Sequence, residues 1–195
     1  MTVIAMTYEI GTQGRQIASE LAVRLGIDFA DDQFLERRIA DRLMHGKGRV
    51  GTWAQQARNV DDWTLARRAT DEIMELSAYG NVLIRGWGAA SLLRGKAHVI
   101  RVRVCAPASF RLRVLAERYP AQDDAALRWL IKHSDACLAS NLEPVLGPDW
   151  QSDDLYHLKI DAQEMPVSSS VDVLERLIEA RTRIMVEPQS GLHPY

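Results

Sequence analysis

The sequence predicts an α/β fold in which a mostly parallel sheet of about five strands lies between two layers of helices. Short β-type runs alternate with helical segments along the chain, and a glycine-bearing turn joins the first run to the first helix. No internal repeat or low-complexity segment competes with this prediction. A chain of 195 residues, 47% of them hydrophobic, can bury one large core, so we expect a single domain.

The expected strands are short apolar runs bounded by turns. The first, over residues 2–7, contains β-branched residues and stops before a glycine turn, as a buried parallel strand does. Further strands are expected at residues 81–85, 98–105 and 155–160. Ligands of such folds bind at the carboxyl ends of the strands, so the turns after them are the places to look for a site.

The expected helices carry apolar residues at a spacing of three or four. The first covers residues 15–25, and Gly26 follows it where a left-handed cap is favoured. The others are expected at residues 32–44, 61–79, 107–119, 123–140 and 170–184. Glycine and proline favour loops at 45–51 and 141–154, and the domain, residues 1–185, is expected to end in a loose tail at 186–195.

Charge and composition argue against several classes of protein. Lys and Arg total 24 against 26 Asp and Glu, so no overall basic field is available to hold nucleic acid. The amino terminus lacks the basic start of a signal peptide, and no apolar run is long enough to cross a membrane, so we expect a cytoplasmic protein with no membrane contact. Cys105 and Cys137 lack metal-ligand spacing, which favours reduced thiols and no protein metal centre.

A candidate phosphate loop joins the first expected strand to the first helix. Backbone N–H groups and the helix dipole favour an anion at such a turn, and glycines let the backbone approach it closely. A Gly-x-x-Gly turn alone is equally consistent with a tight connection. The residues expected to bind the phosphates are Gly11, Thr12, Gln13, Gly14, Arg15 and Gln16.

Five segments together resemble one protein family. The chain reads Thr-Tyr-Glu-Ile-Gly-Thr-Gln-Gly-Arg-Gln-Ile-Ala over residues 7–18, which is similar to Ser-Arg-Glu-aromatic-Gly-Ser-Gly-Gly-Arg-Glu-Ile-Ala of the cytidylate kinase-like family. The segments 29–35, 80–93, 106–113 and 131–139 resemble further parts of that family in order and spacing. The resemblance implies a three-layer α/β/α P-loop NTPase-type fold, with a helical lid at about 120–150.

The resemblance also implies an activity. ATP would donate its γ-phosphoryl group to a nucleoside monophosphate such as CMP or dCMP, or to another small phosphorylated acceptor, and Mg²⁺ would bridge the ATP phosphates. Such transfer depends mainly on positioning and on cations around the transferred group. Arg15 and Arg37 are the candidate catalytic cations, and Asp31, Arg37, Trp87, Arg111 and Asp135 are the candidate substrate-binding residues.

Several of these residues have a plainer alternative. Arg37 also fits an exposed helix surface, and Trp87, which replaces a family arginine, either stacks on a base or packs between its glycine neighbours. Arg85 is near this position but is expected to point to the opposite side of its strand. His133 is expected to lie on a helix surface without a catalytic role.

The sequence departs from the family where cations and magnesium would be bound. The usual P-loop lysine is absent, so Arg15 is the local substitute, and Gln16 replaces the hydroxyl that reaches magnesium. Gln13 replaces a glycine and narrows the loop, and Leu138 replaces a lid arginine. Thr12 is the remaining hydroxyl for magnesium.

Three functions therefore remain in competition. The first is a working kinase, and the second is a catalytically weakened nucleotide or anion sensor that keeps the kinase fold. The third is an interaction protein that presents tryptophans to a partner or to a second copy in a homodimer, with Trp53, Trp63 and Trp129 as the candidates.

Overall fold

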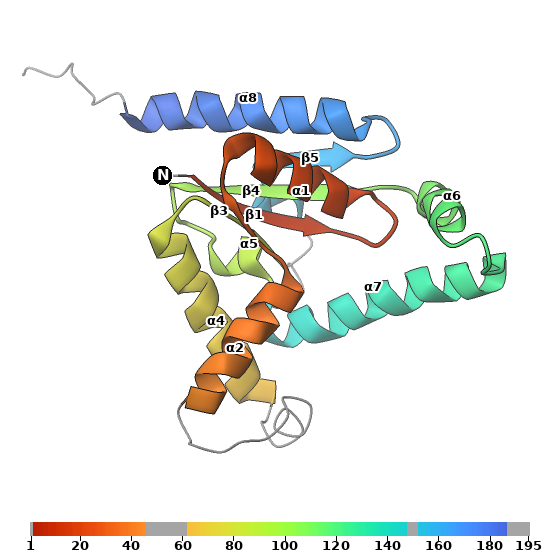
Figure 1. Cartoon of the computed structure of the whole chain (residues 1–195), viewed down its shortest axis with the longest axis horizontal. Coiled ribbons are helices and arrows are strands. Elements are labelled where there is room, and N and C mark those ends of the chain that lie inside the picture. The colour runs from red at the N-terminus through yellow and green to blue at the C-terminus, as the bar shows by residue number, and fades with distance from the viewer. Residues whose placement is uncertain (1, 46–61, 148–151, 187–195) are drawn as a thin grey trace, which may run out of the picture.

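The computed structural model describes residues 2–45, 62–147 and 152–186, and within them it has the predicted α/β/α architecture (Figure 1). A five-stranded sheet has the order β2-β3-β1-β4-β5, and all four strand pairs are parallel. The strands are β1 Val3–Tyr8, β2 Asp28–Ala30, β3 Val82–Arg85, β4 Val99–Cys105 and β5 Leu158–Asp161. The prediction of a mostly parallel, about five-stranded sheet is confirmed.

Strand β1 occupies the centre of the sheet and determines where the candidate phosphate loop emerges. Val3 pairs with Val82 of β3 on one side and with Val99 of β4 on the other. The first four residues of β1 are almost fully buried, as the apolar sequence predicts. Its carboxyl end lies between the ends of β3 and β4, which is the part of a parallel sheet that favours ligand binding.

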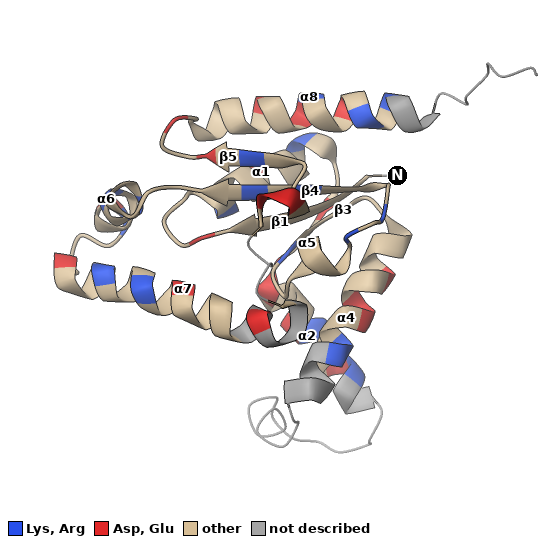
Figure 2. Cartoon of the chain, turned by 180° about the vertical axis from the view of Figure 1, so that it is seen from behind, with Lys and Arg blue, Asp and Glu red and all other residues tan. Residues whose placement is uncertain are grey.

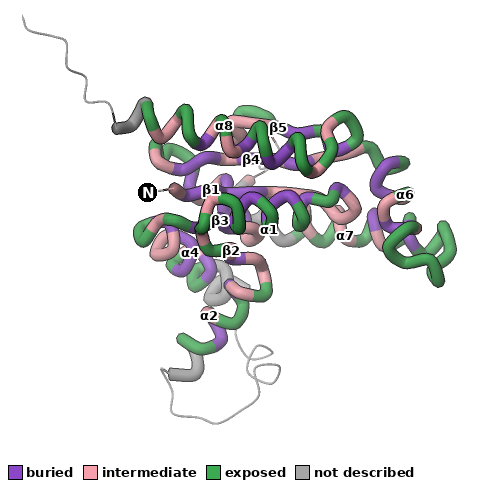
Figure 3. Tube along the Cα trace, turned by 45° about the horizontal axis from the view of Figure 1, so that its top comes forward, coloured by how far each residue is buried: buried purple, intermediate pink, exposed green. Residues whose placement is uncertain are grey.

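Helices cover both faces of the sheet (Figures 1 and 3). They are α1 Gly14–Leu25, α2 Asp32–His45, α4 Asp62–Tyr79, α5 Ala89–Leu92, α6 Ala108–Arg118, α7 Asp124–Leu146 and α8 Val167–Val186, with a 3₁₀ turn, η2, at Asp153–Leu155. Helices α1 and α8 cover one face, whereas α2, α4 and α5 lie on the other. None of the helices in the described part of the chain has the length and apolar character needed to cross a membrane.

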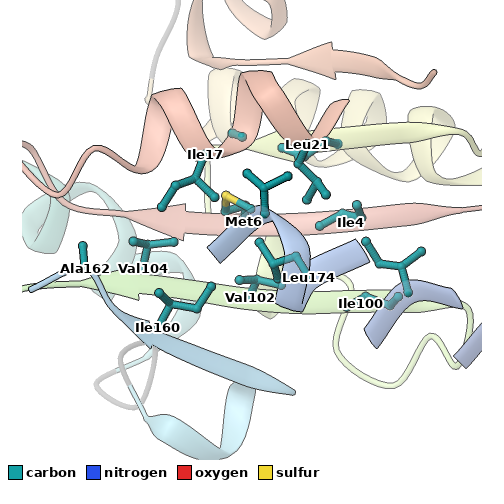
Figure 4. Packing of buried hydrophobic residues seen from close by; sticks show 14 of the residues in the cluster. Ile4, Met6, Ile17, Leu21, Ile100, Val102, Val104, Ile160, Ala162 and Leu174 are labelled. Carbon is teal, nitrogen blue, oxygen red and sulfur yellow. The ribbon is translucent and has the colours of Figure 1, made fainter. Parts of the chain in front are cut away.

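The alternation of side chains along β1 divides the core into two halves. Ile4 and Met6 pack with Ile17 and Leu21 of α1 and with Leu174 of α8 (Figure 4). The residues between them, Val3 and Ala5, belong to the cluster under α4 and α5. Successive residues of a strand point to opposite faces, so both halves follow from one short sequence.

Three elements differ from their predicted boundaries by more than one residue. Helix α7 continues to Leu146, so the irregular segment expected from residue 141 begins later; Gly147 ends the helix, and its N–H donates to Glu143 O at 2.9 Å. Helix α8 begins at Val167 and not at residue 170, because three serines, residues 168–170, belong to its first turn. Strand β5 begins at Leu158, since residues 153–155 form η2.

Two predicted loops lie largely outside the described residues. The loop expected at 45–51 falls there from residue 46 onward, and the tail expected at 186–195 does so from residue 187. The single-domain boundary at residue 185 and the lid assignment for residues 120–150 stay predictions.

Candidate active site

A buried threonine determines the shape of the candidate phosphate loop. Thr12 is fully buried; its hydroxyl donates to Glu9 O at 2.7 Å and accepts from Gly14 N at 3.3 Å. A second bond runs from Thr12 N to Glu9 O at 3.3 Å. The hydroxyl group of Thr12 is thus engaged within the loop, and the backbone after it is held at the start of α1.

Glycines at two positions of the loop allow a close approach to neighbouring chain segments. A Cβ atom at Gly14 would lie 2.3 Å from Tyr8 Cβ, and one at Gly11 would lie 2.8 Å from Arg111 O. Gly11 also has a φ of 81°, and Gln13 has a φ of 58°. Because a non-glycine residue in the left-handed region costs on the order of 1 kcal/mol, Gln13 introduces local strain where the family has glycine.

A large cavity opens in front of this loop at the carboxyl ends of the strands. Its volume is about 1400 Å³, and it is lined by the loop, by α2, α4, α5 and the end of β3 on one side, and by α6 and α7 on the other. The candidate residues that line it are Gly11, Gln13, Gly14, Arg15, Gln16, Trp87 and Asp135. Four others, Thr12, Asp31, Arg37 and Arg111, do not belong to its lining.

Arg15 is the cation of the loop and is linked to the end of β2. Its Nη2 lies 2.9 Å from Asp31 Oδ2, and the Arg15 side chain is 60% exposed. The other oxygen, Asp31 Oδ1, accepts a hydrogen bond from Phe34 N at 3.0 Å and so caps α2. An exposed ion pair contributes little free energy, so an incoming phosphate can compete for Arg15.

Helix α2 presents acidic residues to the cavity, which sequence reasoning missed. Asp32 and Glu36 line the cavity, whereas Arg37 donates from Nε to its own helix, at 3.2 Å from Gln33 O. The spacing of four between Asp32 and Glu36 would have placed them on one helix face. The spacing alone does not indicate which face of the helix lines the cavity.

Arg85 lies in the cavity, contrary to the prediction that it would point away. It forms an ion pair with Asp32, and its guanidinium lies 4.6 Å from the centre of the Tyr8 ring. Arg85 is the last residue of β3, where strand alternation no longer constrains a long side chain. Burial raises the pKa of Tyr8, and the nearby Arg85 opposes that shift.

Trp87 borders both the core and the cavity, and its stacking on a base stays a prediction. The side chain lines the cavity and also packs against the buried cluster under α4 and α5. Trp87 has a φ of 48°, and the glycines on either side of it also have positive φ. A Cβ at Gly86 would overlap the Asp32 carboxylate, so this turn, β3 and α2 are closely packed.

Arg111 connects the phosphate loop to helix α7. Its side chain is 5% exposed; Nε donates to Ile10 O at 2.6 Å, and the two Nη atoms lie 2.9 and 2.7 Å from the Asp135 oxygens. Glu9 Oε2 lies 3.6 Å from Nη1, and Glu9 Oε1 accepts from Arg103 at 3.1 Å. Arg111 and Asp135, both expected to bind substrate, are thus bound to each other and hold α6, α7 and the loop together.

Helix α7 presents an apolar residue to the cavity where the family pattern has an arginine. Leu138 lines the cavity, as do Ser134 and Ser140. His133 lies on the exposed side of the helix, stacked on Trp129 at 4.6 Å between ring centres. In the described part of α7, then, no arginine reaches the cavity wall.

The sequence matches the model of the cytidylate kinase-like family over residues 3–164. The chain belongs to the cytidylate kinase-like family. Membership supports a kinase-type, nucleotide-binding protein, and the family in general implies the use of ATP and Mg²⁺. No curated protein sequence matches the chain significantly.

Solved structures share the fold of this family member at low sequence identity. An uncharacterized protein from Eubacterium ventriosum is 16% identical with a TM-score of 0.75, and the match covers 92% of this chain and 99% of that one. Shikimate kinase from Bacteroides thetaiotaomicron is 16% identical, with a TM-score of 0.56 and coverages of 91% and 98%. A gluconokinase from Sinorhizobium meliloti is 13% identical, with a TM-score of 0.53 and coverages of 95% and 98%. The fold is that of P-loop kinases.

Proposed function

We propose that this protein is an ATP-dependent phosphotransferase that moves the γ-phosphoryl group of ATP to a small acceptor. The observation that carries the proposal is the phosphate loop itself. Gly11 and Gly14 hold its backbone where no Cβ would fit, and the loop opens on a cavity of about 1400 Å³. CMP and dCMP are the acceptors that the family name suggests.

The loop supplies the groups that such a reaction needs for phosphate. The backbone N–H groups of Gln13, Arg15 and Gln16 stand at the start of α1, where the helix dipole favours an anion. Arg15 adds an exposed positive charge beside them, in the place of the usual lysine. Arg37 would reach the acceptor only after its side chain leaves the Gln33 carbonyl.

The residues around the loop fit a magnesium ion that arrives with the nucleotide. Mg²⁺ keeps several waters and takes one or two carboxylates together with substrate phosphates. Asp31 and Asp32, at the start of α2, are the carboxylates that would hold it, and each is bound to an arginine. The described residues contain no cluster of three or more His, Cys, Asp or Glu that would bind a metal by itself. Magnesium would neutralise charge that develops on the transferred phosphoryl group.

ADP release on the full chain tests this proposal. ATP with magnesium would be incubated with CMP, dCMP and a panel of other small acceptors, and ATP binding would be followed by calorimetry. We expect Arg15→Ala to weaken ATP binding and turnover at least tenfold, and Arg15→Lys to recover part of both. Arg113→Ala removes an exposed arginine outside the cavity and serves as the matched control. Unchanged turnover in Arg15→Ala contradicts the role of Arg15.

A catalytically weakened nucleotide or anion sensor is the second candidate. Arg15, Arg85 and Arg111 are each paired with an aspartate, and Leu138 replaces the lid cation. Because each missing cation removes transition-state stabilisation, binding without turnover is the signature of this function. Tight ATP binding together with no ADP release across the acceptor panel would favour the sensor.

An interaction protein is the third candidate, and one tryptophan supports it. Trp129 is 62% exposed on α7, which is unusual for so large an apolar side chain. The side chains of Trp53 and Trp63 lie outside the described residues. A homodimer that depends on Trp129 in sedimentation, with no nucleotide binding at all, would favour this function.

A further inference from the structure

The cavity has a second wall, distinct from the phosphate loop. Helix α2 contributes Asp32 and Glu36 to it, the end of β3 contributes Arg85, and the turn after β3 contributes Trp87. Ala69, Thr70 and Leu92 complete this wall from α4 and α5. We call these seven residues the acceptor wall.

Contacts with the core and with α4 fix the rotation of α2 about its own axis, so its acidic face lines the cavity. Leu35 and Ile39 are buried in the core, and Arg38 forms an ion pair with Glu72 of α4, whose side chain is 1% exposed. Arg42 reaches the same carboxylate at 3.0 Å; Figure 2 shows the acidic and basic positions of α2 and α4 close together. Turning α2 to bring Arg37 inward would break these contacts.

The acceptor wall carries more negative than positive charge. Asp32 and Glu36 are its acids, and Arg85 is the cation among its described members. Arg85 is already bound to Asp32 and lies over the Tyr8 ring. Glu36, by contrast, is exposed to the cavity and forms no hydrogen bond or ion pair with a described residue. The wall therefore has one free carboxylate and no free cation among the residues that the structure describes.

Recognition of a phosphate or carboxylate normally uses arginine in a bidentate pair. The acceptor wall has Trp87 where the family pattern has such an arginine, and a free carboxylate on the helix opposite. Glu36 accepts hydrogen bonds from hydroxyl and ammonium groups and repels anions. A tryptophan face adds apolar contact and attracts cations.

We propose that the acceptor is an alcohol that carries no negative charge, and that Glu36 binds it through a hydroxyl or an ammonium group. This inference rests on the proposed phosphotransferase activity, and it excludes CMP and dCMP, the acceptors that the family name suggests. The acceptor oxygen forms a bond to the γ-phosphorus, and the bond from that phosphorus to the β,γ-bridging oxygen breaks. ADP leaves, the hydroxyl proton is released, and the product is a phosphate monoester.

Matched acceptor pairs that differ in charge test the proposal. Cytidine is compared with CMP, and glucosamine with glucosamine 6-phosphate and with gluconate, by ADP release and by calorimetry on the full chain with ATP and magnesium. We expect kcat/KM or affinity at least tenfold higher for the uncharged or cationic member of a pair. Preference for the anionic members, or no binding of any member, overturns the proposal.

Variants that change the charge of Glu36 test whether this residue causes the preference for uncharged or cationic acceptors. Glu36→Gln should lower the preference for glucosamine over gluconate about tenfold, and Glu36→Lys should make gluconate the preferred acceptor. Glu179→Gln is the control, because Glu179 is an exposed acid of α8 outside the cavity. An unchanged preference in Glu36→Lys overturns the role of Glu36. Loss of ATP binding in Arg15→Ala still tests the phosphotransferase separately, so failure of one proposal is distinguishable from failure of the other.

Discussion

Replacing Gly14 by alanine tests whether the phosphate loop depends on close packing against β1. The new Cβ would lie 2.3 Å from Tyr8 Cβ and 2.4 Å from Tyr8 Cγ, well inside van der Waals contact. Tyr8 cannot easily move, because it ends β1 and its ring lies beneath the Arg85 guanidinium. The start of α1 must therefore shift, and with it the N–H groups that face the cavity.

The expected change in stability follows from two opposing effects. Overpacking of this kind costs up to about 3 kcal/mol. Alanine in place of glycine in a helix returns up to about 1 kcal/mol. A net loss of about 2 kcal/mol corresponds to a fall in Tm of roughly 4–8 °C for a chain of this size.

Thermal unfolding and ATP calorimetry on Gly14→Ala measure both consequences. We expect the lower Tm together with at least tenfold weaker ATP binding, because the loop backbone is displaced. Gly26→Ala is the matched control: a Cβ there meets nothing within 4 Å, although its φ of 62° costs some strain. It should lower Tm without affecting ATP binding. A Gly14→Ala protein with unchanged Tm and unchanged ATP affinity would refute the packing argument.

Three further changes test other parts of the structure. Arg111→Met should lower the free energy of unfolding by about 2–3 kcal/mol in urea titrations, because it leaves Asp135 and a loop carbonyl without their partner; a loss below about 0.5 kcal/mol would contradict this. Burial, followed by the charges of Arg101 and Arg181, lowers the pKa of His157 to about 4. The His157 imidazole binds a proton more readily in the unfolded chain than in the folded one. The free energy of unfolding therefore keeps its full value above pH 6.5 and falls as the pH drops toward 4, by at most about 3 kcal/mol. The free energy of unfolding at pH 7 and at pH 5 measures this loss, and the His157→Gln variant should lose less stability between the two pH values. Leu138→Arg should tighten ATP binding about tenfold by calorimetry, whereas Leu138→Met should not; equal affinities would argue that α7 does not face the bound phosphates.

Much of the fold could be predicted because it depends on local patterns. The run at 2–7, the glycine turn and the helix ending at Gly26 are each visible in fewer than a dozen residues. The boundaries that were missed lie where local chemistry was ambiguous. Three serines open α8, and α7 continues past the residue where the sequence suggested a loop, because Gly147 provides its end.

The candidate site was predicted in its loop and less well in its walls. Gly11, Gly14 and Arg15 line the cavity as expected, since they follow directly from the end of β1. Arg111 and Asp135 were both selected from the sequence, but nothing in it indicated that they bind each other across a separation of 24 residues. A pairing of that kind depends on how α6 and α7 pack.

The sequence by itself determined the order of strands and helices except β2 and α5, the central parallel sheet and the position of the candidate phosphate loop. These depend on side-chain periodicity and on the backbone freedom of glycine, which are properties of short segments. Only the tertiary structure decided that Asp32, Glu36 and Arg85 face the cavity while Arg37 does not. The physical reason is that the rotation of α2 is set by the burial of Leu35 and Ile39 and by ion pairs with Glu72, which lies at least thirty residues away in the sequence.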